Sequence, residues 1–78
     1  MEVKSKVKDV IVNLLKIKPE ELKDGVSLQD SIGVDSTEMV ETVIALEKAF
    51  GTKLSPKDIT KTSTINEIET VIKAKIAG

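Results

Sequence analysis

The sequence predicts an all-α fold, a four-helix bundle with a short third helix and a long loop between helices 1 and 2. Apolar residues recur at helical spacing in three separate segments, and two of these segments open with the spacing of a capping box. Glycine or proline follows two of the apolar stripes, where helices commonly end. The 78 residues are one domain in size, so we expect residues 1–78 to form a single domain.

The first helix is predicted from Val3 onward, because the apolar residues that follow form one stripe at helical spacing. We expect Lys16 and Lys18 in its last turn, where cations suit the helix dipole. Pro19 then ends it, because the residue before a proline is pushed out of the α region. The stripe consists of Val3, Val7, Val10, Ile11, Leu14 and Leu15.

Residues 19–34 show no helical periodicity and are predicted to form the long loop. A loop of this length in a small domain is typically functional or is packed down by its own side chains. Gly25 and Gly33 allow turns, and we expect Val26, Leu28 and Ile32 to tuck under the bundle.

The second helix is predicted over residues 36–50. Asp35 is a suitable N-cap, and Glu38 three residues later completes a capping box. Gly51 suits the position just past the helix end. The expected apolar face consists of Val40, Val43, Ile44, Leu46, Ala49 and Phe50.

A short third helix is predicted from Pro56, with Ser55 as its cap and Asp58 in its first turn. Only Ile59 is apolar within it, so its stability must come from packing. The fourth helix is predicted to begin near Thr64, which opens the second capping-box spacing. Its apolar stripe consists of Ile65, Ile68, Val71, Ile72 and Ile76.

The composition argues against most catalytic and nucleic-acid-binding classes. The chain has no Cys and no His, which removes thiolate metal sites, cysteine nucleophiles and the usual general base. It has no Arg, its pI is about 5.4, and Phe50 is its single aromatic residue, so we expect no nucleic-acid partner. A helix-turn-helix DNA binder is the weakest alternative. We expect no metal, because the carboxylates of Asp30, Asp35 and Glu38 lack the ordered spacing of a calcium loop.

We expect a cytoplasmic protein without a membrane segment. The longest apolar run, residues 43–46, is far too short to span a bilayer. Residues 1–10 alternate charged and apolar side chains and do not form the apolar region of a signal peptide.

Acidic residues concentrate in the middle of the chain. Residues 19–50 carry a net charge of −6, against +3 in residues 1–18 and +2 in residues 51–78. Such a field raises the encounter rate with a basic partner surface. A solvated face without a partner is the other interpretation of the charge alone.

The segment around Ser36 carries the candidate chemistry. Its hydroxyl, in the first turn of the second helix, is reachable by another enzyme. A phosphodiester there would lie beside unpaired backbone N–H groups and the positive end of the helix dipole, although Asp35 and Glu38 would oppose it. Ser36 cannot be the nucleophile of a catalytic triad, because the chain has no His to activate it. An ordinary first-turn serine is the alternative interpretation.

Residues 3–76 resemble the acyl carrier protein family in length, helix order, acidic second helix and the run Gly33-Val34-Asp35-Ser36. The match continues through Val40, Glu41, Val43, Ala45, Leu46, Glu47 and Phe50. The resemblance implies a carrier and not an enzyme. A phosphopantetheinyl transferase would attach 4′-phosphopantetheine to Ser36, and the arm's thiol would carry acyl groups as thioesters. It implies a monomer serving fatty-acid, polyketide or related enzymes.

The resemblance also implies where partners and cargo bind. Asp35 would lie beside the cofactor, and the acidic helix would dock on basic patches of acyl-processing enzymes. The implied docking residues are Thr37, Glu38, Met39, Glu41 and Glu47. The implied acyl pocket consists of Leu28, Val40, Val43, Leu46, Leu54, Ile59, Thr62, Ile65, Ile68 and Ile72. These pocket positions are also ordinary core positions.

Three threonines depart from the family pattern. Thr37 stands where the family usually has an exposed Leu, which weakens the expected grip of a standard transferase. Thr42 and Thr62 stand where aliphatic residues are common, and we expect them to make the cavity smaller or more polar. These changes predict a specialised carrier. The alternatives left open are an aminoacyl or peptidyl carrier, and a carrier-like docking module that is never modified.

Overall fold

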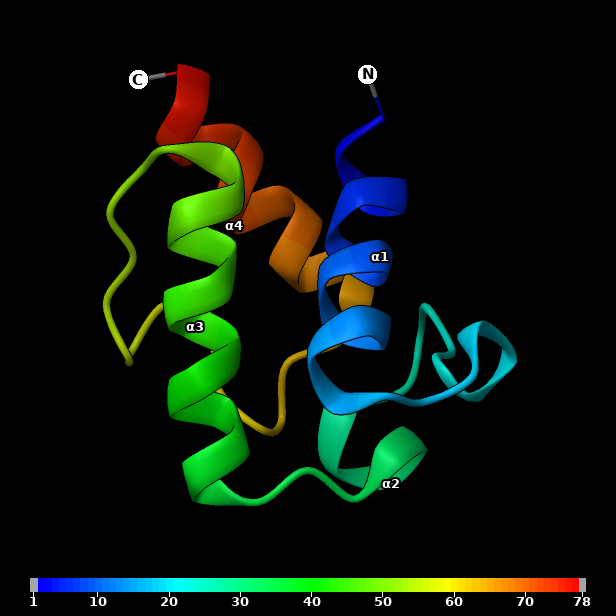
Figure 1. The fold of residues 1–78 in the computed structure, drawn as a ribbon. Coiled ribbons are helices and arrows are strands. Elements are labelled where there is room, and N and C mark those ends of the chain that lie inside the picture. The colour runs from blue at the N-terminus through cyan, green and yellow to red at the C-terminus, as the bar shows by residue number, and fades with distance from the viewer. Residues whose placement is uncertain (1, 78) are drawn as a thin grey trace.

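The structure is a computed structural model that describes residues 2–77, and four α-helices make up most of this range. These are α1 (Val3–Leu15), α2 (Leu28–Ile32), α3 (Ser36–Phe50) and α4 (Ile65–Ala77), with a 3₁₀ turn, η1 (Pro19–Glu21), after α1. Helix α1 packs against both α3 and α4, so the long helices share one core (Figure 1). The predicted all-α, four-helix fold is confirmed. The ends of the expected domain, residues 1 and 78, lie outside the described residues.

The core forms where the stripes of the three long helices meet. The fully buried side chains include Val7, Ile11, Leu28, Leu46, Ile65, Ile68 and Ile72. Burying an aliphatic side chain of this size contributes about 1.5–3 kcal/mol relative to leaving it in water. The hydrophobic pattern of the long helices therefore supplies most of the packing that holds the bundle together.

The long connection between α1 and α3 is more ordered than its sequence predicts, because it contains η1 and the short helix α2. Ser27 caps α2 by accepting a hydrogen bond from the Asp30 N–H at 3.1 Å, and Gly33 ends it in the left-handed region at φ 65°. Five residues are too few to show helical periodicity, which is why the pattern missed this helix. Of the three apolar residues expected to tuck under the bundle, Leu28 is buried and Val26 and Ile32 are half-buried. Val34, which follows α2, is buried as well.

The same connection is bonded to the segment before α4. The Leu28 N–H donates to the Ser63 carbonyl at 3.0 Å, and the Gln29 N–H donates to the Lys61 carbonyl at 2.8 Å. These bonds satisfy backbone groups that would otherwise be left without partners at the start of α2. They also fix residues 61–63 beside α2, which determines where the site residues of that segment lie.

The predicted third helix is wrong: residues 56–58 form a turn. The Asp58 N–H donates to the Ser55 carbonyl, and the Ser55 N–H donates back to the Asp58 carboxylate, both at 2.9 Å. These two hydrogen bonds give the N–H groups of Ser55 and Asp58 their partners, so the segment does not need to continue as a helix. Ile59 follows it and is buried, so one apolar side chain anchors the segment.

The first helix ends earlier than predicted. Lys16 adopts the left-handed conformation at φ 56° and caps α1 through its N–H to the Val12 carbonyl, which leaves Lys18 outside the helix. The predicted α3 is confirmed at residues 36–50, and Thr64 caps α4 through a capping box with Glu67. Within residues 2–77, no helix has the length and apolar character needed to cross a membrane.

Candidate functional site

The start of α3 places Ser36 at the first helical position with its side chain exposed. Asp35 has extended backbone angles, and its carboxylate accepts the Glu38 N–H at 2.7 Å. Glu38 in turn accepts the Asp35 N–H at 3.0 Å, which completes the predicted capping box. No hydrogen bond within residues 2–77 engages the Ser36 hydroxyl. The helix therefore begins with a free hydroxyl that faces solvent.

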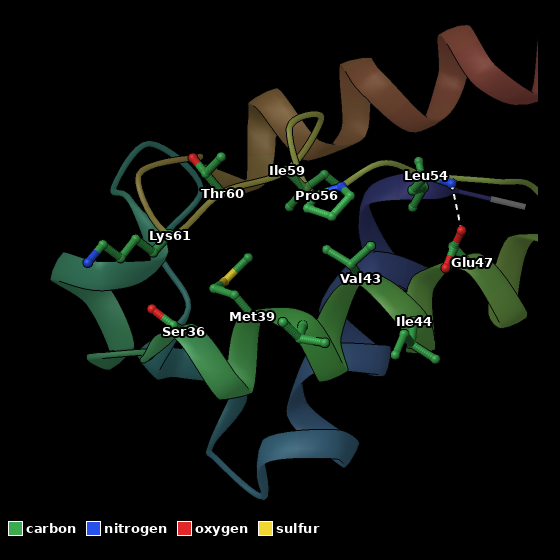
Figure 2. A pocket seen from close by; sticks show the side chains of 11 residues that line it. Ser36, Met39, Val43, Ile44, Glu47, Leu54, Pro56, Ile59, Thr60 and Lys61 are labelled. Atoms are coloured by element: carbon green, nitrogen blue, oxygen red, sulfur yellow. Dashed lines mark hydrogen bonds between the residues drawn. The ribbon is translucent and has the colours of Figure 1, made fainter.

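A groove of about 480 Å³ runs from Ser36 along α3. One wall is the apolar side of α3, and the other is the segment from Leu54 to Lys61 (Figure 2). Met39 and Val43 line the first wall, and Ile59 lines the second. Figure 2 shows Ser36 and Lys61 at one end of the groove and Glu47 with Leu54 at the other. The free hydroxyl thus lies at one end of an apolar groove.

The outer wall of the groove is held by Glu47. Its carboxylate accepts the Leu54 N–H at 2.8 Å, and this bond joins the middle of α3 to the segment that follows the helix (Figure 2). Hydrogen bonds to a charged acceptor are stronger than neutral ones. Glu47 therefore has a structural contact in addition to any role in binding partners.

The structure separates the ten predicted pocket residues into groups. Val40, Val43, Leu54 and Ile59 line the groove. The fully buried residues Leu28, Leu46, Ile65, Ile68 and Ile72 belong to the core and do not line the groove. Thr62 is exposed, so its expected burial is wrong.

Thr42 and Thr62 were expected to make the cavity smaller or more polar, but neither side chain lines the groove. Thr42 is buried at 0% exposure, but it does not line the groove, and its hydroxyl donates to the Glu38 carbonyl at 2.8 Å. Bonding to the carbonyl four residues earlier satisfies the buried hydroxyl inside the helix itself. Thr62 instead shares a hydrogen bond with Thr60 at the surface, 2.9 Å between the two hydroxyl oxygens.

The predicted docking residues fall into exposed and internal positions. Thr37 and Glu41 are exposed, and Glu38 is half-buried in the capping box. Met39 is only 7% exposed and lines the groove, so its side chain is not on the free surface. Val40, expected on the buried face, is 57% exposed. The face of α3 is rotated relative to the predicted stripe, with Met39 inside in place of Val40.

Sequence reasoning missed four residues that line the groove: Ile44, Pro56, Thr60 and Lys61. Ile44 is 45% exposed and lies one turn after Val40, so the two form an exposed apolar pair on α3. The sequence shows the four-residue spacing of this pair, but it does not show that the two side chains are exposed. Lys61 and Thr60 belong to the segment before α4, which is hydrogen-bonded to α2 through the Lys61 and Ser63 carbonyls.

Acidic side chains in the described part of the chain do not gather into a metal site. No group of three or more Asp or Glu residues there comes close enough to hold an ion. The carboxylates of Asp35 and Glu38 are already used by the backbone at the start of α3.

Comparison with known proteins bears on the same segment. The family model for the phosphopantetheine attachment site matches residues 5–72. The chain is 33% identical over 75 residues to the acyl carrier protein of Bdellovibrio bacteriovorus, covering 96% of both chains. It is 35% identical over 72 residues to that of Campylobacter hominis, covering 92% of this chain and 91% of the relative. It is also 33% identical over 75 residues to the acyl carrier protein of Thermotoga maritima, covering 96% of this chain and 93% of the relative.

The chain therefore belongs to the phosphopantetheine-binding acyl carrier protein family. Its role is to carry acyl groups, and its cofactor is 4′-phosphopantetheine. Membership implies interaction with a phosphopantetheinyl transferase and with acyl-processing enzymes.

The residues at the start of α3 fit this cofactor. Attachment needs an accessible hydroxyl that is not engaged elsewhere, and Ser36 is exposed and free of hydrogen bonds within residues 2–77. An apolar groove begins at the same residue, so an arm joined there can lie against the protein or extend into solvent.

Proposed function

We propose that Ser36 is the residue that carries 4′-phosphopantetheine, in a chain that is a single acyl-carrier domain. The observation that supports this most is the position of its hydroxyl, exposed at the first residue of α3 and at the end of the groove. The terminal thiol of the bound cofactor supplies the thioester link to the acyl group. This accounts for thiol chemistry in a chain that has no Cys of its own.

We further propose that the protein is not an enzyme. A serine becomes a nucleophile only when a neighbouring base activates it, and the chain has no His. The two acids nearest Ser36 in sequence, Asp35 and Glu38, hold the helix start through backbone N–H groups. Ser36 is accordingly a passive acceptor, which the transferase activates and modifies.

The groove is the proposed shelter for the first part of an acyl chain. Val40, Val43, Leu54 and Ile59 give it an apolar lining, to which each buried CH₂ of cargo adds about 0.8 kcal/mol. An apolar cavity of roughly 150 Å³ already binds a benzene-sized guest, so about 480 Å³ suffices for a short chain without repacking. The core residues behind it, such as Leu46 and Ile68, would have to move for longer cargo.

The proposed docking surface for partners is the exposed side of α3. Glu41 is its exposed acid, and Val40 and Ile44 form an exposed apolar pair beside it. An enzyme with a basic patch around an apolar spot would match this surface in charge and in contact. The remaining proposals are that the chain acts as a monomer in the cytoplasm, with fatty-acid or polyketide enzymes as partners.

Thr37 is the feature that keeps a second function open. It is exposed next to Ser36, where the family usually presents a leucine. A smaller polar side chain offers a transferase less apolar contact, so an unmodified carrier-like docking module is the alternative.

Intact mass spectrometry decides between the two functions. We would co-express the chain with a broad-specificity phosphopantetheinyl transferase and compare the wild type with Ser36→Ala and Thr37→Leu. The proposal expects the wild type to gain the mass of one phosphopantetheine and Ser36→Ala to gain none. A wild type that stays unmodified while Thr37→Leu is modified would support the docking-module alternative. A gain that persists in Ser36→Ala would assign the cofactor to another residue.

A further inference from the structure

The charges around the Ser36 end of the groove are unbalanced for a phosphodiester. Asp35 precedes Ser36, and Glu38 lies on the same first turn of α3, so two carboxylates flank the attachment position. Both would repel the single negative charge of the phosphodiester. Lys61 is the one cationic side chain of the described residues that lines the groove, and it lies at this same end (Figure 2).

The backbone of Lys61 is fixed, whereas its side chain is free. Its carbonyl accepts the Gln29 N–H from α2 at 2.8 Å. The residues on either side close a small turn, in which the Thr60 N–H donates to the Ser63 hydroxyl at 3.1 Å and the Ser63 N–H donates to the Thr60 carbonyl at 3.0 Å. The side chain is exposed, and no ion pair between residues 2 and 77 includes its ammonium.

We infer that the Lys61 ammonium binds the phosphodiester on Ser36 and thereby directs the pantetheine arm along the groove. Lysine is a suitable group for this, because it is a compact point charge on a flexible four-carbon stem. The inference rests on the proposed attachment at Ser36. Lys61 is a positioning residue: it holds the arm near the apolar lining and takes no part in the acyl chemistry.

The direction of the arm follows from the two ends of the groove. With the phosphate held between Ser36 and Lys61, the rest of the arm starts over Met39 and Val43. Without that contact, the two flanking carboxylates push the phosphate outward, and the arm extends into solvent. The contact therefore shifts an equilibrium between a docked and an extended arm.

The absence of Cys gives a clean test, because a thiol-reactive spin label on the holo-protein attaches only to the pantetheine thiol. We would measure how strongly the label broadens backbone amide NMR signals. In the wild type we expect broadening at groove residues such as Val40, Ile44 and Thr60. Lys61→Gln should weaken this broadening about two- to fivefold, the change in a two-state equilibrium expected from one exposed ion pair.

Three controls separate an ion pair from a structural effect. Lys57→Gln removes a charge from an exposed lysine in the same segment that does not line the groove, and it should leave the broadening unchanged. Lys61→Arg keeps the positive charge, so the broadening at the groove residues should be as strong as in the wild type. Salt near 1 M shortens the Debye length to about 3 Å, so it should reduce the broadening in the wild type to the level seen in Lys61→Gln.

The possible results are distinguishable. Equal broadening in the wild type, Lys61→Gln and Lys57→Gln would overturn the role of Lys61, even if the holo-protein forms normally. Broadening that is lost equally in Lys61→Gln and Lys57→Gln would also overturn it in favour of a general charge effect. A wild type that gains no phosphopantetheine would instead overturn the proposed function, and intact mass shows this before any label is added.

Discussion

Asp35 is the residue on which the start of α3 depends, and it is also the neighbour of the proposed attachment site. Its carboxylate satisfies the Glu38 N–H, one of the N–H groups that have no partner within the helix. Because α3 forms one wall of the groove, the geometry of the site depends on where this helix begins. The cap therefore links the stability of an element to the presentation of Ser36.

Asp35→Ala should lower the free energy of unfolding by about 1 kcal/mol, the usual effect of losing an N-cap. Urea denaturation followed by circular dichroism measures the change. Ser36→Ala is the matched control, because the Ser36 hydroxyl makes no hydrogen bond within residues 2–77, and it should change stability by less than about 0.5 kcal/mol. Equal effects of the two substitutions would show that the capping box does not stabilise α3.

At this scale the sequence predicted the cap but not the direction of single side chains. Asp35 and Glu38 have a three-residue spacing that specifies their contact locally. Met39 and Val40 are adjacent apolar residues, and their pattern alone does not decide which one faces the groove. That choice depends on where Leu54 and Ile59 lie, because they line the opposite wall of the groove.

Among the elements, the segment after α3 depends on one carboxylate. The Glu47 side chain accepts the Leu54 N–H, seven residues further on, and this bond sets the outer wall of the groove. Glu47→Ala should lower the free energy of unfolding by about 1–2 kcal/mol, since it removes a charged acceptor from a partly buried N–H. It should also speed hydrogen exchange at the Leu54 amide, measured by NMR.

Glu41→Ala is the matched control for the wall. Glu41 is an exposed acid on the same helix, so its loss should leave both stability and Leu54 exchange nearly unchanged. If Glu47→Ala behaves like Glu41→Ala, packing alone holds the outer wall of the groove and the Glu47–Leu54 hydrogen bond does not stabilise it.

The backbone at the end of α1 is strained at Lys16, and a glycine at this position would relieve the strain. Lys16 occupies the left-handed region at φ 56°, a conformation that costs a non-glycine residue about 1 kcal/mol or more. Lys16→Gly relieves this cost but increases the freedom of the unfolded chain, so we expect a net gain of about 0.5 kcal/mol in unfolding free energy. A thermal or urea melt measures it. A destabilised Lys16→Gly would mean that the lysine stem contributes packing that offsets the strain.

The length of an element decides whether its hydrophobic pattern is enough to predict it. Helices α1, α3 and α4 are long enough for their apolar stripes to repeat, and all three were predicted. The five residues of α2 are too few for a stripe, and the helix depends on backbone bonds to the segment before α4. The turn at residues 56–58 has the composition of a helix start, but its carboxylate closes back on Ser55.

At the scale of the whole molecule, salt bridges join the connecting segments to the long helices. Asp24 in the long connection pairs with Lys8 at 2.5 Å and with Lys4 at 3.6 Å on α1, and Lys4 also approaches Glu69 on α4 at 3.9 Å. Asp58 in the turn pairs with Lys75 on α4 at 3.4 Å. Both carboxylates therefore tie a connecting segment to a long helix.

These contacts predict how stability depends on pH. The hydrogen bond from Lys8 lowers the pKa of Asp24 below its ordinary 3.8, and the Ser55 N–H together with Lys75 lowers the pKa of Asp58. The unfolded chain consequently binds more protons than the folded one in acid. The stabilisation is complete above pH 3.8 and is lost as the pH falls through the lowered pKa values.

Urea denaturation at a series of pH values between neutral and acid measures this dependence. Asp24→Asn and Asp58→Asn should each be less stable than the wild type at neutral pH, and each should lose less further stability on acidification. A double variant with the full acid sensitivity of the wild type would assign the dependence to other carboxylates.

The proposed attachment of the carrier arm to Ser36 can be tested on the protein as its own cells make it. The most direct measurement is fragmentation mass spectrometry of the protein purified from the cells that make it naturally. We expect phosphopantetheine on the peptide that contains Ser36, with the modification localised to that residue. A Ser36 that is unmodified in every growth condition, or a phosphopantetheine localised to any other residue, would contradict it.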